Sequence, residues 1–223
     1  MNILPEQEPV ARRKRIRLPP EVRRQQILDA ALIEFSAHGF SGATTGRIAR
    51  RAGTTQSNLY VHFATKDEIF ETLLRQVLVP SNGIWKPMRP GQRLEDVIDA
   101  FIEDAYDQMT PQSLAVIRLL VSESHRIPDL IRHWYADAVV PAHAEQRRRA
   151  DEYVAAGQMR DTPLNDDFGF LTAPVLYTAI MRIVLPGDIA EREFHKIRET
   201  HREVLRLLLS PGVEGARRTD DPR

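Results

Sequence analysis

Apolar residues recur along this chain at spacings of three and four, the period of an α-helix that buries one face. The period extends over seven segments, residues 21–38, 66–78, 94–109, 111–125, 128–157, 165–185 and 188–209. Pro141 lies inside the fifth segment, where we expect a break or kink because proline lacks the helical N–H donor. No segment alternates as a β-strand does. With two shorter helices described next, the pattern predicts an all-α fold of about nine helices.

The two short helical patterns lie in residues 44–66 and meet at a tight corner. Ala49 and Ala52 are small and apolar, which lets a second helix cross the first one closely. Gly53 follows, and glycine tolerates the left-handed conformation needed where a helix stops. The next helix is predicted for residues 56–63. This arrangement is typical of a helix-turn-helix, whose second helix enters the major groove of DNA.

The charges of the chain are unevenly distributed, although its formal net charge is zero. Residues 10–66 carry eleven Lys and Arg against three acids, whereas residues 67–223 carry twenty against twenty-six. A basic first third is the electrostatic pattern of a DNA-binding region on a body with another task. Within it lies a basic arm that contains Arg12, Arg13, Lys14, Arg15 and Arg17. The arm either follows the DNA backbone or minor groove, or is a flexible, solvated run of charge.

Composition and motifs argue against several other classes of protein. Apolar residues make up 42% of the chain, enough for a packed core, and the absence of cysteine excludes disulfides and zinc–thiolate sites. The sequence has no H-E-x-x-H spacing, nucleophile elbow or phosphate-binding glycine loop, so we expect no enzyme activity, cofactor or metal. No apolar run approaches the roughly 20 residues of a membrane span, and the N-terminus is unlike a signal peptide. We therefore expect a cytoplasmic protein with no membrane partner.

The corner matches one known family at many positions and at the same spacing. The matching residues are Thr44-Thr45, Ile48-Ala49, Ala52-Gly53, Leu59-Tyr60, His62-Phe63 and Lys66. By this pattern, residues 20–75 resemble the TetR/AcrR family of bacterial transcriptional regulators. Together with the stretch rich in proline and glycine after residue 80, the resemblance divides the chain into four parts. They are a flexible basic arm (1–19), a helix-turn-helix domain (20–80), a ligand-binding and dimerisation domain (81–209) and a disordered tail (210–223).

The resemblance implies a homodimer that binds a pseudo-palindromic operator in double-stranded DNA and represses nearby genes. It also implies a small apolar or amphipathic effector that binds in the body, spreads the two heads and releases the DNA. Such a protein is associated with the bacterial nucleoid while it is bound to its operator. The alternative is a DNA-binding regulator without a small ligand, controlled by a partner protein.

The resemblance also assigns DNA contacts to particular residues. Base edges are read from the first turn of the recognition helix, whose solvent side carries Gln56, Ser57 and Asn58. The other DNA-binding candidates, chiefly for phosphate contacts, are Thr44, Thr45, Arg47, Thr55, Tyr60, His62 and Lys66. The alternatives are that Tyr60 covers apolar surface and that His62 is an ordinary surface residue. Gly46 stands where some relatives place a base-reading side chain, so the operator sequence does not carry over.

Two long amphipathic helices close the chain and predict a four-helix bundle across a two-fold axis. Their apolar stripes supply the dimer-interface candidates Leu171, Val175, Thr178, Phe194, Ile197, His201, Val204, Leu205 and Leu208. The alternative is that these stripes pack inside one protomer. The effector-pocket candidates of the middle helices are Phe101, Tyr106, Met109, Glu123, Trp134, Phe168, Phe170, Tyr177 and Met181. For each of them, the alternative is a place in the core.

Overall fold

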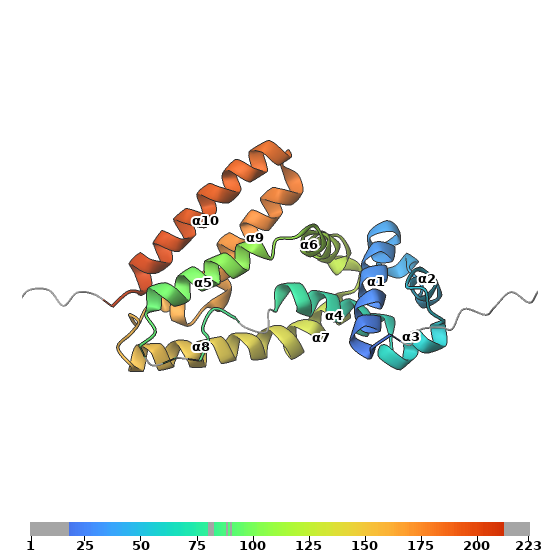
Figure 1. Ribbon diagram of the computed structural model, residues 1–223, viewed down its shortest axis with the longest axis horizontal. Helices are drawn as coiled ribbons and strands as arrows, with labels where there is room; N and C mark the ends of the chain where they lie inside the picture. Colours follow the sequence, from blue (N-terminus) through green and yellow to red (C-terminus); the bar gives the residue numbers. More distant parts are fainter. Residues whose placement is uncertain (1–17, 80–82, 88, 90, 212–223) are drawn as a thin grey trace, which may run out of the picture.

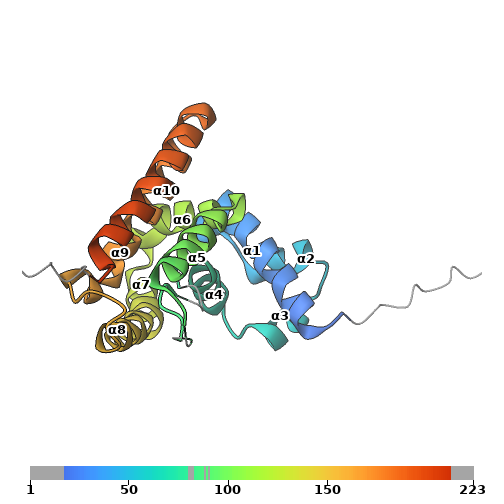
Figure 2. The same ribbon diagram turned by 60° about the vertical axis from the view of Figure 1, so that its left-hand side comes forward.

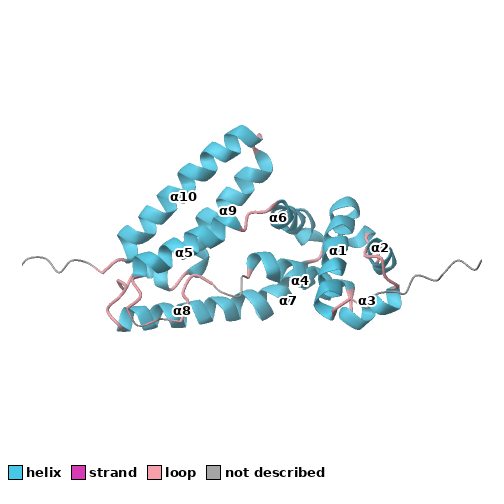
Figure 3. Cartoon of the chain, in the orientation of Figure 1, coloured by secondary structure: helices cyan, strands magenta, loops and turns pink. Residues whose placement is uncertain are grey.

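The computed structural model describes residues 18–79, 83–87, 89 and 91–211. Every regular element in this part of the chain is helical (Figure 3). The molecule is elongated, with α1, α2 and α3 at one end and the antiparallel pair of α9 and α10 toward the other (Figure 1). The predicted all-α fold is confirmed.

The head, by which we mean residues 18–79, contains four helices. They are α1 (Pro20–Gly42), α2 (Thr45–Arg51), α3 (Gln56–His62) and α4 (Lys66–Leu78). Gly39, the residue after the predicted first helical segment, forms a break inside α1, with a φ of 68° that only glycine adopts readily. The break turns Phe40 into the core, where its ring centroid lies 5.5 Å from that of Phe35 and 5.2 Å from that of Phe70.

The body, residues 83–211, contains the remaining helices. They are α5 (Leu94–Asp107), α6 (Pro111–Glu123), α7 (Pro128–Trp134), α8 (Val140–Ala155), α9 (Phe168–Val184) and α10 (Gly187–Leu209), with short 3-10 turns at Ser124–Arg126 and Pro163–Asn165. α10 packs against α9 and α5 (Figure 2). Within the body, α6 is the helix next to the head. It packs against α1 and α4 of the head and against α9 of the body.

The two internal prolines have different effects on their helices. Pro141 is the second residue of α8, and the turn before it, Tyr135–Val139, is π-helical. A wider turn accommodates a residue that cannot donate a backbone hydrogen bond, so the predicted break is a π segment that joins α7 directly to α8. Pro174 leaves α9 continuous, and the Thr178 hydroxyl donates to the Pro174 carbonyl at 2.7 Å.

The apolar core of the head continues into the body. The buried side chains of α1 to α4 form one cluster with Val116, Leu119, Trp134, Ala138 and Val139, which belong to α6 and the α7–α8 segment. Trp134, a predicted pocket residue, is thus part of this shared core, which is the alternative that the sequence left open. A displacement of α6 would act directly on the packing of α1 and α4.

Glu123 is a second predicted pocket residue that the structure places at the junction of head and body. Its carboxylate is buried and accepts a hydrogen bond from the backbone N–H of Phe40 at 3.0 Å, just after the break in α1. Arg126 donates to its other oxygen at 3.1 Å. Glu123 thus connects the end of α6 to the end of α1 and does not line a cavity.

A polar pair is buried between α5, α9 and α10. The Tyr106 hydroxyl lies 3.1 Å from Nδ1 of His201, and Nε2 of His201 lies 2.9 Å from the Leu171 carbonyl. A neutral imidazole with its proton on Nε2 satisfies both contacts. Burial lowers the pKa of His201 to about 4, despite the hydrogen bond to Leu171, and raises that of Tyr106 to about 12.

We expect His201 to make the protein less stable in weak acid. Its pKa is about 4 when folded and about 6.5 when unfolded, so the unfolded chain binds the proton more readily below pH 6.5. The stability is complete above pH 6.5, and about 2 kcal/mol is lost between pH 7 and pH 5. Urea unfolding at these two pH values measures the loss. His201→Gln keeps an N–H donor without titrating in this range, and should show a smaller difference between the two pH values. An equal difference in both proteins would contradict the assignment.

Candidate nucleic-acid interface and cavity

The corner between α2 and α3 has the geometry of a helix-turn-helix. Gly53 adopts a φ of 64°, and the N–H of Thr54 donates to the Ala49 carbonyl at 2.9 Å, which closes the turn. The Thr55 hydroxyl then caps α3 by accepting from the N–H of Asn58 at 3.2 Å. Leu59 is fully buried beneath α3 and anchors the helix to the head. The opposite side of α3 is left exposed.

Three side chains form a hydrogen-bonded group on the exposed side of the corner. The Gln56 amide donates to the Thr45 hydroxyl at 2.8 Å, and the Tyr60 hydroxyl lies 3.2 Å from the Thr45 hydroxyl. The hydrogen bonds with Thr45 and then Gln56 lower the pKa of Tyr60. These contacts bring one predicted base-reading residue and two predicted phosphate contacts together on one surface. They also orient the Gln56 amide before any DNA is present.

The neighbours of Gln56 leave room for a base to approach. Ser57 is exposed, and the Asn58 amide is held by the Thr54 hydroxyl at 2.8 Å. A Cβ atom at Gly46 would lie 3.6 Å from Oε1, the side-chain amide oxygen of Gln56. The absence of a side chain there thus keeps that oxygen uncovered, and Gln56 and Ser57 are the most accessible polar groups of the three predicted readers.

Arg47, a predicted phosphate contact, is paired within the head. Its Nε lies 3.0 Å from the buried carboxylate of Glu34, and its guanidinium also contacts His38. Arg51 donates to the same carboxylate at 2.7 Å. This hydrogen bond from Arg51, with the charge of Arg47, lowers the pKa of Glu34. In the DNA-free protein both arginines therefore hold α2 against α1. The third basic residue of α2, Arg50, has no ion pair within the described residues.

Lys66, another predicted phosphate contact, fastens α4 to the end of α1. Its ammonium donates to the carbonyls of Phe40 at 2.7 Å and Ala43 at 3.1 Å, and it lies 4.3 Å from the centre of the Phe40 ring. Two of its three N–H groups are thus engaged inside the head, so the geometry favours a structural role over a phosphate contact. His62 is half-buried, and its carbonyl accepts from Arg24 at 2.6 Å.

Of the remaining DNA-binding candidates, two threonines cap helices and the arm residues lie outside the described part of the chain. The Thr44 hydroxyl caps α2 by accepting from the N–H of Arg47 at 3.3 Å, as the Thr55 hydroxyl caps α3. Both oxygens therefore organise the helix ends. The predicted arm residues Arg12, Arg13, Lys14, Arg15 and Arg17 lie outside the described residues.

The predicted dimer-interface stripe lies for the most part inside the protomer. Its buried members are Leu171, Thr178, Phe194, His201 and Leu205. Val175 and Ile197 are half-buried, and only Val204 and Leu208 are exposed. Most of these residues therefore lie where the alternative of packing inside one protomer would place them. They pack against α5 and against each other, while ion pairs such as Arg202 to Glu103 at 2.6 Å join α10 to α5.

A different set of apolar side chains on α9 and α10 is exposed. We call it the α9/α10 face, and it consists of Phe170, Tyr177, Ile180, Val184, Val204, Leu207 and Leu208. Phe170 and Tyr177 had been predicted to line a pocket, but they are 65% and 53% exposed. On α9 these residues recur with the helical period, so the helix is apolar on both its inner and its outer side. Several large apolar side chains exposed on one pair of helices commonly mark an interaction site.

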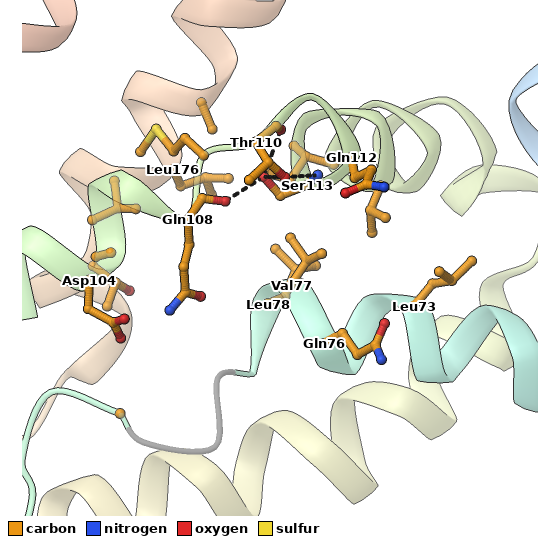
Figure 4. Close-up of a pocket in the computed structure, with 18 of the residues that line it drawn as sticks. Leu73, Gln76, Val77, Leu78, Asp104, Gln108, Thr110, Gln112, Ser113 and Leu176 are labelled. Carbon is orange, nitrogen blue, oxygen red and sulfur yellow. Dashed lines mark hydrogen bonds between the residues drawn. The ribbon is translucent and has the colours of Figure 1, made fainter. Parts of the chain in front are cut away.

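A cavity of about 480 Å³ lies where the head meets the body. It is bordered by α1, α4, α5, α6, α8 and α9, and Figure 4 shows Leu73, Val77 and Leu78 of α4 facing Ser113 of α6 and Thr110, the residue before α6. The predicted pocket residues Phe101, Met109 and Phe168 line it. The other predicted pocket residues, Tyr106, Glu123, Trp134, Phe170, Tyr177 and Met181, do not border this cavity.

A second cavity, of about 690 Å³, adjoins the first along α8. The two share part of their lining, including Gln76, Asp104, Gln108, His143 and Phe168. Sequence reasoning missed Asp104 and Gln108, because polar residues on a helix are ordinarily taken as its solvent side. Asp104 belongs to α5 and Gln108 follows its last residue, and both line the cavity (Figure 4).

The described residues contain neither a cluster of metal ligands nor a helix suited to a membrane. Among them, no three His, Cys, Asp or Glu side chains are grouped as a metal site requires. Nor does any helix in this part of the chain combine the length and the apolar character that crossing a membrane requires.

Comparison with known proteins places the chain in a family. Residues 27–73 match the family described as bacterial regulatory proteins, tetR family. Over 209 residues the chain is 30% identical to the HTH-type transcriptional repressor AcnR of Corynebacterium glutamicum. The alignment covers 91% of this chain and 96% of AcnR. The chain therefore belongs to the TetR family, and it is a DNA-binding transcriptional repressor, as the resemblance of its corner implies.

Solved structures of the family share the fold. A putative TetR-family regulator from Mesorhizobium loti superimposes with a TM-score of 0.63 at 16% identity, over 87% of this chain and all of that one. The SmeT–triclosan complex gives a TM-score of 0.58 at 18% identity, over 91% of this chain and all of SmeT. At these identities the likeness concerns the fold alone.

Proposed function

We propose that the chain acts as a homodimer that binds a pseudo-palindromic operator and releases it when a small molecule enters the body. The observation that carries the proposal is the placement of two exposed surfaces. The polar side of α3, with Gln56 and Ser57, lies at one end of the molecule, and the α9/α10 face lies on the body away from it (Figure 1). A protein with both surfaces can pair through its body and still present two recognition helices to DNA.

A second copy of this chain is the partner that best fits the α9/α10 face. α9 and α10 form an antiparallel pair, and two such pairs related by a two-fold axis make a four-helix bundle with a closed apolar interior. Two helix-turn-helix heads bind half-sites about 34–36 Å apart, which one head alone cannot span. The dimer thus accounts for the apolar surface and for the small size of a single recognition helix.

The position of the cavity supports release by a small molecule. Leu32 belongs to α1 and Val77 to α4, whereas Phe101 and Val116 belong to the body, and all four line the same space. A molecule bound there contacts both parts and changes how α6 rests on α1 and α4. SmeT, which shares the fold, has been solved with triclosan, and its complex is consistent with a cavity of this kind in a relative.

Selection from random double-stranded DNA tests the proposal. We expect the full chain to enrich sequences with two-fold symmetry, and sedimentation to show two protomers on each operator. Binding should weaken steeply with salt, because each phosphate contact contributes about 0.9 to the slope of log K against log salt. Enrichment of an asymmetric site by a single protomer would contradict the dimer. A screen in which no small molecule releases the DNA, while a partner protein does, would favour the alternative of a protein-controlled regulator.

A further inference from the structure

We propose that the cavity between head and body takes an amphipathic cation, a molecule with an apolar body and one positive charge that lies beside Asp104. The inference rests on the proposed function, because it names the chemical class of the effector. It follows from the kinds of side chain that line the cavity and from the partners those side chains already have.

The charged side chains of the 480 Å³ cavity have one sign. Asp29 and Asp104 line it, and among the described residues that border it there is no Lys or Arg. The Asp29 carboxylate accepts from the Gln25 amide at 2.8 Å. Asp104 has no hydrogen-bond or ion-pair partner for its carboxylate within the part of the chain that the structure describes. A half-buried carboxylate without a partner favours a cation and disfavours an anion beside it.

The cationic groups of the adjoining cavity do not neutralise Asp104. Arg149 lines only the second cavity, where it donates to Glu145 at 2.7 Å and to the Trp85 carbonyl at 3.0 Å. Arg75 also lines only the second cavity and is exposed on α4. The imidazole of His143 lies in the shared part, with its ring edge-on to Phe168 at 5.1 Å between centroids. The charge that both cavities share is therefore the carboxylate of Asp104.

The rest of the lining suits an apolar molecule. Leu73, Val77 and Leu78 project from α4 into the space, opposite the first turn of α6 (Figure 4). The Ser113 hydroxyl is occupied, because its one proton is shared between the carbonyls of Gln108 at 2.7 Å and Thr110 at 2.9 Å. A volume of about 480 Å³ lies within the range of about 300–1,000 Å³ found for small-molecule sites. An apolar body thus has partners, and Asp104 and Gln108 supply the polar end.

Two probes of nearly identical shape and opposite charge test the inference. Tetraphenylphosphonium and tetraphenylborate are titrated into the full chain by isothermal calorimetry. We expect the phosphonium ion to bind about tenfold more tightly than the borate, or better. Asp104→Asn should weaken the phosphonium ion by about tenfold and leave the thermal unfolding of the protein unchanged. Asp107→Asn, an exposed change on the same helix that lies outside both cavities, should leave both affinities as they are.

Several results would overturn the inference. They are equal affinities for the two probes, tighter binding of the borate, no binding of either probe, and equal effects of the two variants. Operator binding is measured on the same samples, which separates this failure from that of the proposed function. A protein that binds a symmetric operator but shows no preference for the cation refutes only the effector class. A protein that prefers the cation but selects no symmetric DNA refutes only the proposed function.

Discussion

Tyr177→Asp is expected to convert the protein to a monomer and to weaken its binding to operator DNA by about a hundredfold or more. Tyr177 projects from α9 within the α9/α10 face and is 53% exposed in the single chain. If this face pairs with a second copy, the substitution places an unpaired carboxylate in an apolar interface, which costs several kcal/mol. Two joined heads gain about 10²–10⁴ in affinity over one, and the monomer loses that gain. Analytical ultracentrifugation and a fluorescence binding assay measure the two effects.

The chain contains a matched control for this change. Tyr135, in the π segment between α7 and α8, is also 53% exposed, but it lies outside the α9/α10 face. Tyr135→Asp introduces the same charge at the same exposure, so it should leave both the dimer and the operator affinity unchanged. Circular dichroism confirms that both variants keep their helices. A dimeric Tyr177→Asp protein, or a monomeric Tyr135→Asp protein, would show that the interface lies elsewhere.

The head could be predicted from the sequence because local signals agree with each other there. Gly53 was predicted to follow the end of the first short helix and residue 56 to begin the next, and the structure has α2 ending before Gly53 and α3 starting at Gln56. Leu59, an apolar residue within the predicted second helix, is buried beneath it. Helix ends of this kind are determined by a few neighbouring residues. The helix-turn-helix corner and its exposed side could therefore be predicted from the sequence alone.

The orientation of α9 could not be predicted in the same way. Leu171 and Thr178 mark one apolar side and Tyr177 and Val184 another, so the helix has apolar residues on two sides. Periodicity identifies a stripe only when the opposite side is polar. The inner side was therefore taken for the dimer interface, and part of the outer side for a pocket. Which side is buried depends on α5 and α10, which lie far away along the sequence.

The roles of single polar residues were also beyond sequence reasoning. Glu123 binds a backbone N–H 83 residues away, and Lys66 binds carbonyls at the end of α1. Nothing in their own neighbourhood distinguishes these side chains from exposed ones. Asp104 was missed for the same reason, because its position beside a cavity is set by α4 and α6. Pairing partners and empty space are properties of the assembled chain.

Gln56→Ala should remove the preference for one base pair in each half-site of the operator. Glutamine makes two hydrogen bonds to adenine in the major groove, and the loss of such a pair costs about 1–3 kcal/mol. A symmetric operator meets Gln56 twice, so we expect the matched sequence to bind about 2–6 kcal/mol more weakly. The amide is already oriented by the Thr45 hydroxyl at 2.8 Å, so little ordering of this side chain opposes the contact. Affinities for a set of operators with single base changes measure the effect.

The pattern of losses distinguishes base reading from a general effect of Gln56 on the head. If Gln56 reads a base, the variant binds all substitutions at one symmetric pair of positions equally, and its affinity for non-specific DNA stays unchanged. Gln112→Ala, the same change at an exposed position on α6 in the body, should preserve the full preference. A loss that is uniform over every sequence would instead assign Gln56 to the Thr45–Tyr60 group as a support for backbone contacts. The recognition would then depend on Ser57 and on the shape of the DNA.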